Sequence, residues 1–253
     1  MSKFFVNQNQ INNNIISIQG QDVNHIKNVL RYQLGDSIVV CDNDTSTNYK
    51  CEIISIDKDS INCKIIEQLD SSTESNIKLT VFQGLPKADK MELIIQKGTE
   101  LGISTFVPVS MKRSIVKLDS KDASKKQTRW QTIAEVASKQ CGRDLIPQVE
   151  SVITFKQLLD RCNDFDLTIL AYEQEKQLSI KQVLEQLKFG SKYKNKEHIN
   201  IAFIVGPEGG IDDQEAIQLQ DKNVQVVTLG KRILRTETAP LALASIIMYE
   251  LEN

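Results

Sequence analysis

The chain of 253 residues lacks any apolar run near the roughly 18 residues that a membrane span needs. Its N-terminus lacks the apolar segment of a secretory signal peptide, so we expect none. The five cysteines are scattered and form no C-x-x-C pair, which leaves neither a disulfide framework nor a zinc site to be recognised. These absences predict a cytoplasmic protein with reduced thiols, no membrane contact and no bound metal.

Proline and glycine are scarce in the first part of the chain. All five prolines lie at or after Pro86, and two of the eleven glycines precede position 77. The polar stretch 69–76 separates the two compositions and is typical of a linker. We therefore predict two domains, residues 1–70 and residues 77–253.

The first domain has the pattern of a small β-barrel. Apolar runs at 15–18, 38–41, 49–56 and 61–67 indicate strands, and the last two flank a hairpin turn. Helical spacing of apolar residues over 23–30 predicts one helix. Short strands with one helix in about 70 residues favour a barrel.

The second domain alternates between strands and helices. Strands are predicted at 78–83, 105–109, 167–170, 199–205 and 224–229, and helices at 88–101, 124–141, 155–160, 178–187 and 241–251. A polar helix pattern also begins at Asp212. This alternation predicts an α/β fold whose parallel sheet carries helices on its faces.

Neither a dinucleotide fingerprint nor a P-loop occurs in the chain. Two other strand-to-helix loops stand out. Gly206-Pro207-Glu208-Gly209-Gly210 combines glycines that expose backbone N–H groups with a proline that stiffens the turn. The segment 229–240 places Lys231, Arg232 and Arg235 beside two large apolar residues, a mixture suited to a nucleobase pocket. Ligands of open α/β sheets bind at such loops.

Charge is unevenly distributed although the net charge is only −2. Residues 1–70 carry six Lys/Arg and nine Asp/Glu, whereas residues 111–129 carry seven cations against Asp119 and Asp122. A solvated surface explains such a run, and so does a contact with a polyanion.

Motifs along nearly the whole chain resemble one enzyme family in the same order. The two loops, with Ile233-Leu234-Arg235-Thr236-Glu237-Thr238-Ala239, are similar to the closing motifs of SPOUT-class methyltransferases, and more narrowly of the RsmE family, which methylates N3 of a uridine in small-subunit ribosomal RNA. Gln83-Gly84-Leu85-Pro86-Lys87 resembles the family's first βα unit. Gln140-Cys141-Gly142-Arg143 resembles its central helix, and the segment 25–31 its N-terminal signature.

The resemblance implies a PUA-like β-barrel followed by a SPOUT α/β domain with a parallel sheet and a trefoil knot. It implies a homodimer that binds S-adenosyl-L-methionine. The implied cofactor-binding residues are Leu170, Ala171, Gly206, Pro207, Glu208, Gly209, Leu229, Gly230, Ile233, Leu234, Thr238 and Ala239.

Methylation of uridine N3 requires loss of the proton that a neutral uracil carries there. A guanidinium near the uracil oxygens stabilises the resulting anion, and Arg235 or Arg232 is placed to do this. Glu237 either accepts the proton or orients Arg235, and a structural role at the start of the last helix is equally open.

The predicted partner is small-subunit ribosomal RNA, free or in a part-assembled particle. The predicted contacts are Lys27, Arg31, Lys87, Lys112, Arg113, Lys125, Lys126 and Arg143. Two other readings remain open: a SPOUT enzyme that acts on transfer RNA or on a ribose 2′-oxygen, and a non-catalytic assembly factor.

Overall fold

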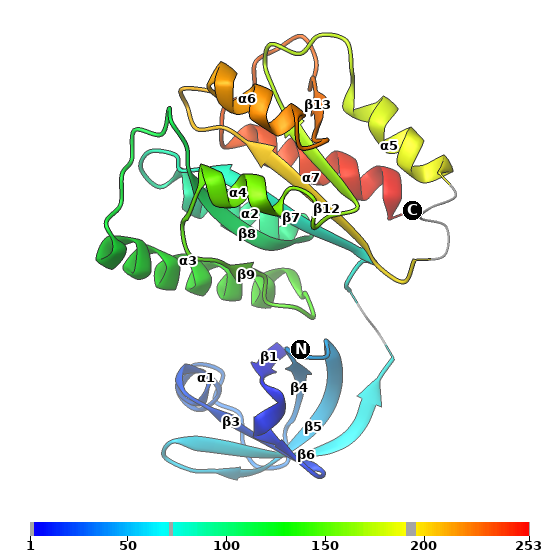
Figure 1. Ribbon diagram of the computed structural model, residues 1–253. Coiled ribbons are helices and arrows are strands. Elements are labelled where there is room, and N and C mark those ends of the chain that lie inside the picture. Colours follow the sequence, from blue (N-terminus) through cyan, green and yellow to red (C-terminus); the bar gives the residue numbers. More distant parts are fainter. Residues whose placement is uncertain (1–2, 71–72, 191–195, 253) are drawn as a thin grey trace. The chain divides into compact units, whose positions relative to one another are not determined.

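The computed structural model describes residues 3–70, 73–190 and 196–252. The chain forms two compact units: residues up to Glu74 together with Ser138–Ile146 make the first, and Ser75–Ala137 together with the chain from Pro147 make the second (Figure 1). Residues 71 and 72 of the predicted linker lie outside the described residues, and so do residues 191–195 of the basic stretch 188–196 between the predicted helix 178–187 and the predicted strand 199–205. Within the described ranges, no helix is long and apolar enough to cross a membrane.

The first unit is built on a six-stranded mixed sheet. Its strands are β1 (Lys3–Val6), β2 (Ile11–Asn12), β3 (Ile15–Gln19), β4 (Ser37–Asp42), β5 (Thr47–Ile56) and β6 (Ser60–Leu69). They lie in the order β1-β4-β5-β6-β3-β2, antiparallel except for the parallel pair β1 and β4. A 3-10 helix, Gln8–Gln10, precedes β2, and α1 (Gln21–Asn24) continues into the π-helix His25–Val29.

The sheet of the first unit curls into a half-barrel. Two register shifts in β5, at Lys50/Cys51 and Ile53/Ser55, bend the strand as bulges do. The concave face closes over a core that includes Ile16, Ile38 and Ile26 of the π-helix. The predicted small β-barrel domain with one helix is observed as this half-barrel with α1, although the parallel strand β1 was not predicted.

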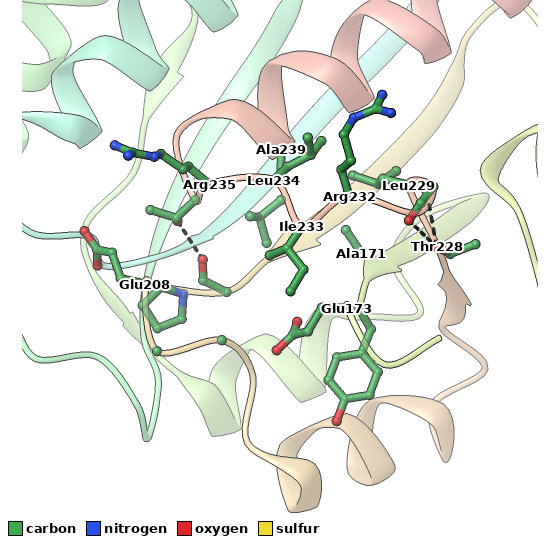
Figure 2. A pocket seen from close by; sticks show the side chains of 18 of the residues that line it. Ala171, Glu173, Glu208, Thr228, Leu229, Arg232, Ile233, Leu234, Arg235 and Ala239 are labelled. Atoms are coloured by element: carbon green, nitrogen blue, oxygen red, sulfur yellow. Dashed lines mark hydrogen bonds between the residues drawn. The ribbon is translucent and has the colours of Figure 1, made fainter. Parts of the chain in front are cut away.

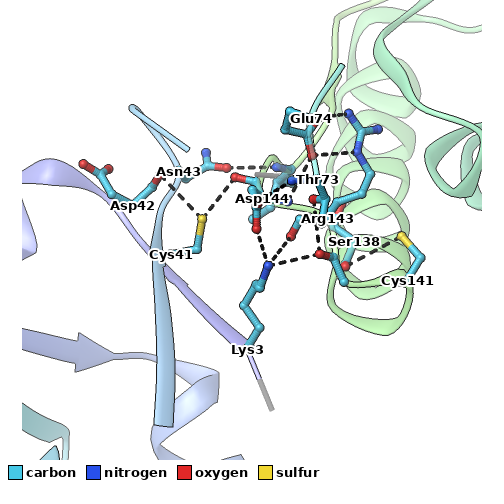
Figure 3. A network of polar contacts seen from close by, with 12 residues as sticks. Lys3, Cys41, Asp42, Asn43, Thr73, Glu74, Ser138, Cys141, Arg143 and Asp144 are labelled. Carbon is cyan, nitrogen blue, oxygen red and sulfur yellow. Dashed lines mark hydrogen bonds and ion pairs between the residues drawn. The ribbon is translucent and has the colours of Figure 1, made fainter. Parts of the chain in front are cut away.

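The segment Ser138–Ile146 belongs to the first unit because a buried polar network holds it there (Figure 3). The Asp144 carboxylate is fully buried, accepts a hydrogen bond from the backbone N–H of Thr73 at 2.6 Å and pairs with Lys3. Arg143 pairs with Glu74 at 2.6 Å. Burial alone raises the pKa of Asp144, but the hydrogen bonds from Lys3 and Thr73 outweigh it and hold the pKa below its ordinary value.

The second unit contains a parallel sheet in the order β10-β8-β7-β12-β11-β13, with β9 also paired to β8. Its strands are β7 (Ile77–Gly84), β8 (Ile103–Ser110), β9 (Gln148–Val149), β10 (Ile153–Thr154), β11 (Leu167–Ala171), β12 (Ile199–Val205) and β13 (Gln225–Val227). The predicted parallel sheet is confirmed. Sequence patterns missed β9 and β10, which are too short to show a period. They also overestimated the length of β13, which was predicted over 224–229.

Helices cover both faces of this sheet. They are α2 (Lys90–Glu100), α3 (Ser120–Cys141), α4 (Phe155–Arg161), α5 (Ile180–Phe189), α6 (Asp213–Gln220) and α7 (Thr238–Leu251). One core gathers side chains of α2, α3, α5 and α7, and the other gathers those of α4 and α6. Alternate residues of β12 divide between them: Phe203 enters the first core and Ile204 the second. Parallel pairing brings the carboxyl ends of β7, β11, β12 and β13 to one edge.

Candidate active site

Three loops at this edge enclose a cavity of about 530 Å³ (Figure 2). The glycine loop, residues 206–212, follows β12, and the arginine loop, residues 228–237, follows β13. The third loop begins after β11 with Tyr172 and Glu173. Lys90, from the start of α2, completes the lining. The volume lies within the range typical of small-molecule sites, about 300–1,000 Å³.

The shape of the glycine loop depends on close backbone approaches. A turn is closed by the hydrogen bond from Gly210 N to Pro207 O at 2.9 Å. Gly210 has φ of +72°, and a Cβ there would overlap the carboxylate of Glu173. A Cβ at Gly84, where β7 ends, would lie 2.7 Å from the backbone nitrogen of Pro207. Glycine at both positions therefore lets the glycine loop approach the third loop and the end of β7 closely.

The arginine loop supplies the apolar part of the lining. Ile233 is 83% exposed, and Figure 2 shows its side chain pointing into the cavity toward Glu173. Leu229, Leu234 and Ala239 line the wall beside it. An exposed isoleucine over an open cavity is available to pack against a flat apolar ligand group.

Charged groups gather where the glycine loop and the arginine loop approach α2. The Lys90 ammonium lies 2.9 Å from Glu208 Oε1 and 3.2 Å from Glu237 Oε2. The hydrogen bond with Glu208, with a further contribution from Glu237, raises the pKa of Lys90. Burial alone raises the pKa of Glu208, but Lys90 and the backbone N–H of Lys87 outweigh it and lower that pKa. Lys90 and Glu208 are therefore both charged at neutral pH.

The predicted catalytic residues lie together but differ in their surroundings. Arg232 and Arg235 line the cavity, and in Figure 2 their guanidinium groups point away from its centre. The Arg235 side chain is 82% exposed, and its nearest ion-pair distance to Glu237 is 3.9 Å. Glu237 does not line the cavity, and it lies closer to Lys90 than to Arg235.

Most of the predicted cofactor-binding residues line the cavity: Ala171, Gly206, Pro207, Glu208, Gly209, Leu229, Gly230, Ile233, Leu234 and Ala239. Leu170 is fully buried in the core under α4 and α6, and Thr238 lies in the first turn of α7 outside the lining.

Sequence reasoning did not single out five of the lining residues: Lys90, Tyr172, Glu173, Val205 and Thr228. Tyr172 and Glu173 follow β11 directly, so the rule that ligands bind where parallel strands end would have found them. No sequence pattern marks Lys90, whose partners lie more than a hundred residues away.

The predicted RNA contacts fall into three groups. Lys27, Arg31, Lys87 and Lys125 are exposed. Lys112 and Arg113 pair with Asp212 at the start of α6, at 2.9 and 3.6 Å, and the Lys126 ammonium lies 5.9 Å from the centre of the Trp130 ring. Arg143 is 6% exposed and pairs with Glu74, so it stabilises the first unit and is not presented to a ligand.

Comparison with known proteins identifies the family. Residues 73–248 match the family model of an RNA methyltransferase domain, and residues 18–66 match that of an RNA methyltransferase PUA domain. The ribosomal RNA small subunit methyltransferase E of Bacillus subtilis is 42% identical over 240 residues, which cover 93% of this chain and 90% of that protein. The protein of the same name from Mesomycoplasma hyopneumoniae is 32% identical over 96% of this chain and 97% of its own length.

Solved structures of similar fold cover the residues of both units. The crystal structure of a ribosomal RNA small subunit methyltransferase E from Neisseria gonorrhoeae bound to S-adenosyl methionine has a TM-score of 0.81 and 29% identity, and the match covers 98% of this chain and 97% of that one. The crystal structure of a hypothetical protein has a TM-score of 0.87 and 39% identity over 99% of this chain and 98% of that one. The chain therefore belongs to the ribosomal RNA small subunit methyltransferase E family.

Proposed function

We propose that the protein transfers a methyl group from S-adenosyl-L-methionine to N3 of a uridine in small-subunit ribosomal RNA. The observation that carries this is the three-loop cavity at the ends of β11, β12 and β13, in a chain that resembles a cofactor-bound methyltransferase of the family over nearly its whole length. Family membership supports methyl transfer to ribosomal RNA, and the motif resemblance supports the uridine N3 atom.

The cavity suits this cofactor in size and chemistry. Leu229, Ile233 and Leu234 offer an apolar wall for the adenine ring, and the glycine loop offers backbone groups. Gly230 has φ of +109°, and nothing lies within 4 Å of the place where its Cβ would stand, so a ligand can approach the backbone there. We assign the cofactor to the predicted residues that line the cavity. When bound, it supplies an electrophilic methyl group.

The chain's own contribution to catalysis is electrostatic. Uridine N3 must lose a proton before or during transfer, which leaves negative charge on the uracil ring. The exposed guanidinium of Arg235, with Arg232 on the same loop, is available to stabilise that charge. Glu237 lies outside the cavity lining and 3.9 Å from Arg235, so its position favours a role in orienting Arg235.

The target uridine must be unpaired or flipped out, because N3 lies on the Watson–Crick edge. We propose that Lys27 and Arg31 on the first unit, and Lys87 and the basic segment 111–129 on the second, contact RNA phosphates. The exposed side chains of Lys117, Lys121 and Lys125 form no ion pair with any described residue, which supports this role. The substrate is free RNA or a part-assembled subunit.

The finer architecture is also proposed from the resemblance. It comprises functional domains at 1–70 and 77–253, a C-terminal segment tucked through a trefoil knot, and a cytoplasmic location. We further propose a homodimer built on α7, whose Tyr249 is 73% exposed next to the half-buried Ile246. Light scattering distinguishes a dimer from a monomer of 28.6 kDa.

A direct test combines binding and product analysis. The purified protein is titrated calorimetrically with S-adenosyl-L-methionine, then incubated with the cofactor and either free small-subunit RNA or isolated subunits. We expect cofactor binding, and a new N3-methyluridine by mass spectrometry of the digested RNA. Binding without any methylated nucleoside would favour an assembly factor. A methyl group on a ribose oxygen would favour another SPOUT activity, and so would methylation of transfer RNA in a parallel reaction that contains it.

A further inference from the structure

The connection from β7 to α2, between Gln83 and Lys90, contacts both the glycine loop and the arginine loop. Gln83 lies outside the cavity lining, and Lys90 lies at its edge. The two residues are separated by the tight passage past Gly84, where the chain packs against Pro207. Each end of the connection therefore has its own set of contacts with the same two loops.

At the buried end, the Gln83 side chain joins the loops through hydrogen bonds. Its amide nitrogen donates to Thr236 Oγ1 at 2.9 Å and lies 3.4 Å from Gly206 O. The Thr236 hydroxyl donates its single proton to Gly206 O at 2.7 Å, so its oxygen must accept from Gln83. Gln83 is fully buried and Thr236 is 7% exposed, so water competes little for these bonds.

At the exposed end, the Lys90 ammonium joins the loops through charge. It lies between Glu208 of the glycine loop and Glu237 of the arginine loop, two carboxylates that would repel each other without it. The backbone N–H of Lys87 also donates to Glu208 Oε1 at 3.0 Å, which fixes that carboxylate against the same connection. Lys90 thus favours the arrangement in which both loops face the cavity.

We propose that Gln83 and Lys90 are positioning residues that hold the glycine loop and the arginine loop in the arrangement that binds the cofactor. The proposal rests on the proposed function, because it takes the cavity between these loops as the cofactor site. The loops follow different strands, and one direct hydrogen bond, from Thr236 Oγ1 to Gly206 O, joins them. Gln83 and Lys90 join them from a third element, so the binding-competent arrangement exists before the cofactor arrives.

Loss of either contact is expected to lower the fraction of molecules in the competent arrangement, which weakens apparent cofactor affinity by that fraction. Thr236→Val removes the hydroxyl but keeps the side-chain shape, and we expect about 10-fold weaker cofactor binding. Thr236→Ser keeps the hydroxyl and is expected to bind within about twofold of the wild type. Gln83→Leu repeats the test from the other partner.

Lys90→Met tests the charged contact, and Lys90→Arg tests whether a cation restores it. Lys97→Met is the matched control, because Lys97 lies on the same helix in an exposed ion pair with Glu100. We expect Lys90→Met to raise both the dissociation constant and the KM for the cofactor several-fold, while saturating cofactor restores kcat. Lys90→Arg is expected to recover most of the affinity, and Lys97→Met to leave it unchanged.

The double variant Lys90→Met/Glu208→Gln separates positioning from direct contact. If Lys90 acts through Glu208, the double variant binds the cofactor no more weakly than the weaker single variant. Multiplied losses of affinity would overturn the proposal, because they indicate that Lys90 affects cofactor binding without joining the two loops through Glu208. Unchanged affinity in both Thr236→Val and Lys90→Met would also overturn it. Circular dichroism identifies any variant that fails to fold. If Gln83→Leu fails to fold, the variants at the half-buried Lys90 still test the proposal.

The outcomes also separate this inference from the proposed function. A wild-type protein that binds no cofactor would refute the proposed function, and this inference with it. A wild-type protein that binds and methylates, with variants of equal affinity, would refute only the positioning role.

Discussion

Gly210→Ala tests whether the glycine loop has the shape described. Gly210 has φ of +72°, a conformation that alanine adopts at a cost, and the added Cβ would overlap Glu173 Oε1. The substitution adds a single methyl group and removes no hydrogen-bonding atom. Any loss of cofactor affinity or of stability therefore reports the cost of the backbone conformation and of the contact with Glu173.

The magnitude follows from these two terms. A left-handed conformation costs a residue with a Cβ about 1–2 kcal/mol. The overlap adds little, because Glu173 is exposed and its carboxylate is free to rotate away. The glycine loop is open to solvent at Glu208 and Gly209, so we expect the empty loop to relax and the cofactor to restore the strained shape. The strain then appears in binding, as a dissociation constant about 5- to 30-fold higher, since 1.4 kcal/mol is tenfold.

The assay is calorimetric titration with S-adenosyl-L-methionine, together with urea unfolding of the cofactor-free protein. Glu173→Ala removes the overlap but not the strain, so Gly210→Ala in that background isolates the backbone term. We expect the free energy of unfolding to change by less than about 0.5 kcal/mol if the empty loop relaxes. An unchanged dissociation constant together with unchanged unfolding would refute the loop conformation, because the strain must appear in one or the other.

Four further outcomes are expected. Arg235→Ala should keep cofactor affinity and lower turnover by about 100-fold or more, measured by methyl incorporation, and normal turnover would move catalysis elsewhere. Lys121→Ala with Lys125→Ala should flatten the salt dependence of RNA binding by up to about 0.7 per lost contact, and an equal slope would leave them a role in solubility. Asp144→Asn should destabilise the protein at pH 7 by about 1–3 kcal/mol in urea unfolding. Because the folded-state pKa of Asp144 is lowered, the wild type should begin to lose this stability as pH falls below about 4, and a difference in stability that grows as the pH falls would contradict the assignment. Ellman's reagent at pH 8 should modify Cys141 rapidly and the other thiols only after unfolding, because those four are buried. A folded Cys141→Ser protein that still contains a rapidly modified thiol would contradict this burial.

The order of strands and helices was predictable because each element carries its own period. The apolar run 199–205 and the helix that begins at Asp212 need no distant information, and the structure places β12 and α6 there. The loops of the site were predictable for a related reason, since the glycines and arginines of a ligand loop are adjacent in sequence.

Long-range contacts were not predictable. Arg143 was predicted to contact RNA, yet it is buried beside Glu74, 69 residues away. Gln83 reaches Thr236 across 153 positions, and nothing near either residue marks the pairing. Such contacts depend on the final packing of the sheet and the loops, and a single sequence contains no local signal for them.

The measurement that tests the central claim most directly is mass spectrometry of small-subunit ribosomal RNA from cells with and without this gene. The gene-deleted cells are complemented with the wild type or with Arg235→Ala. The account predicts one N3-methyluridine that disappears with the gene, returns with the wild type and does not return with Arg235→Ala. An identical set of methylated nucleosides in all four RNA samples would contradict it.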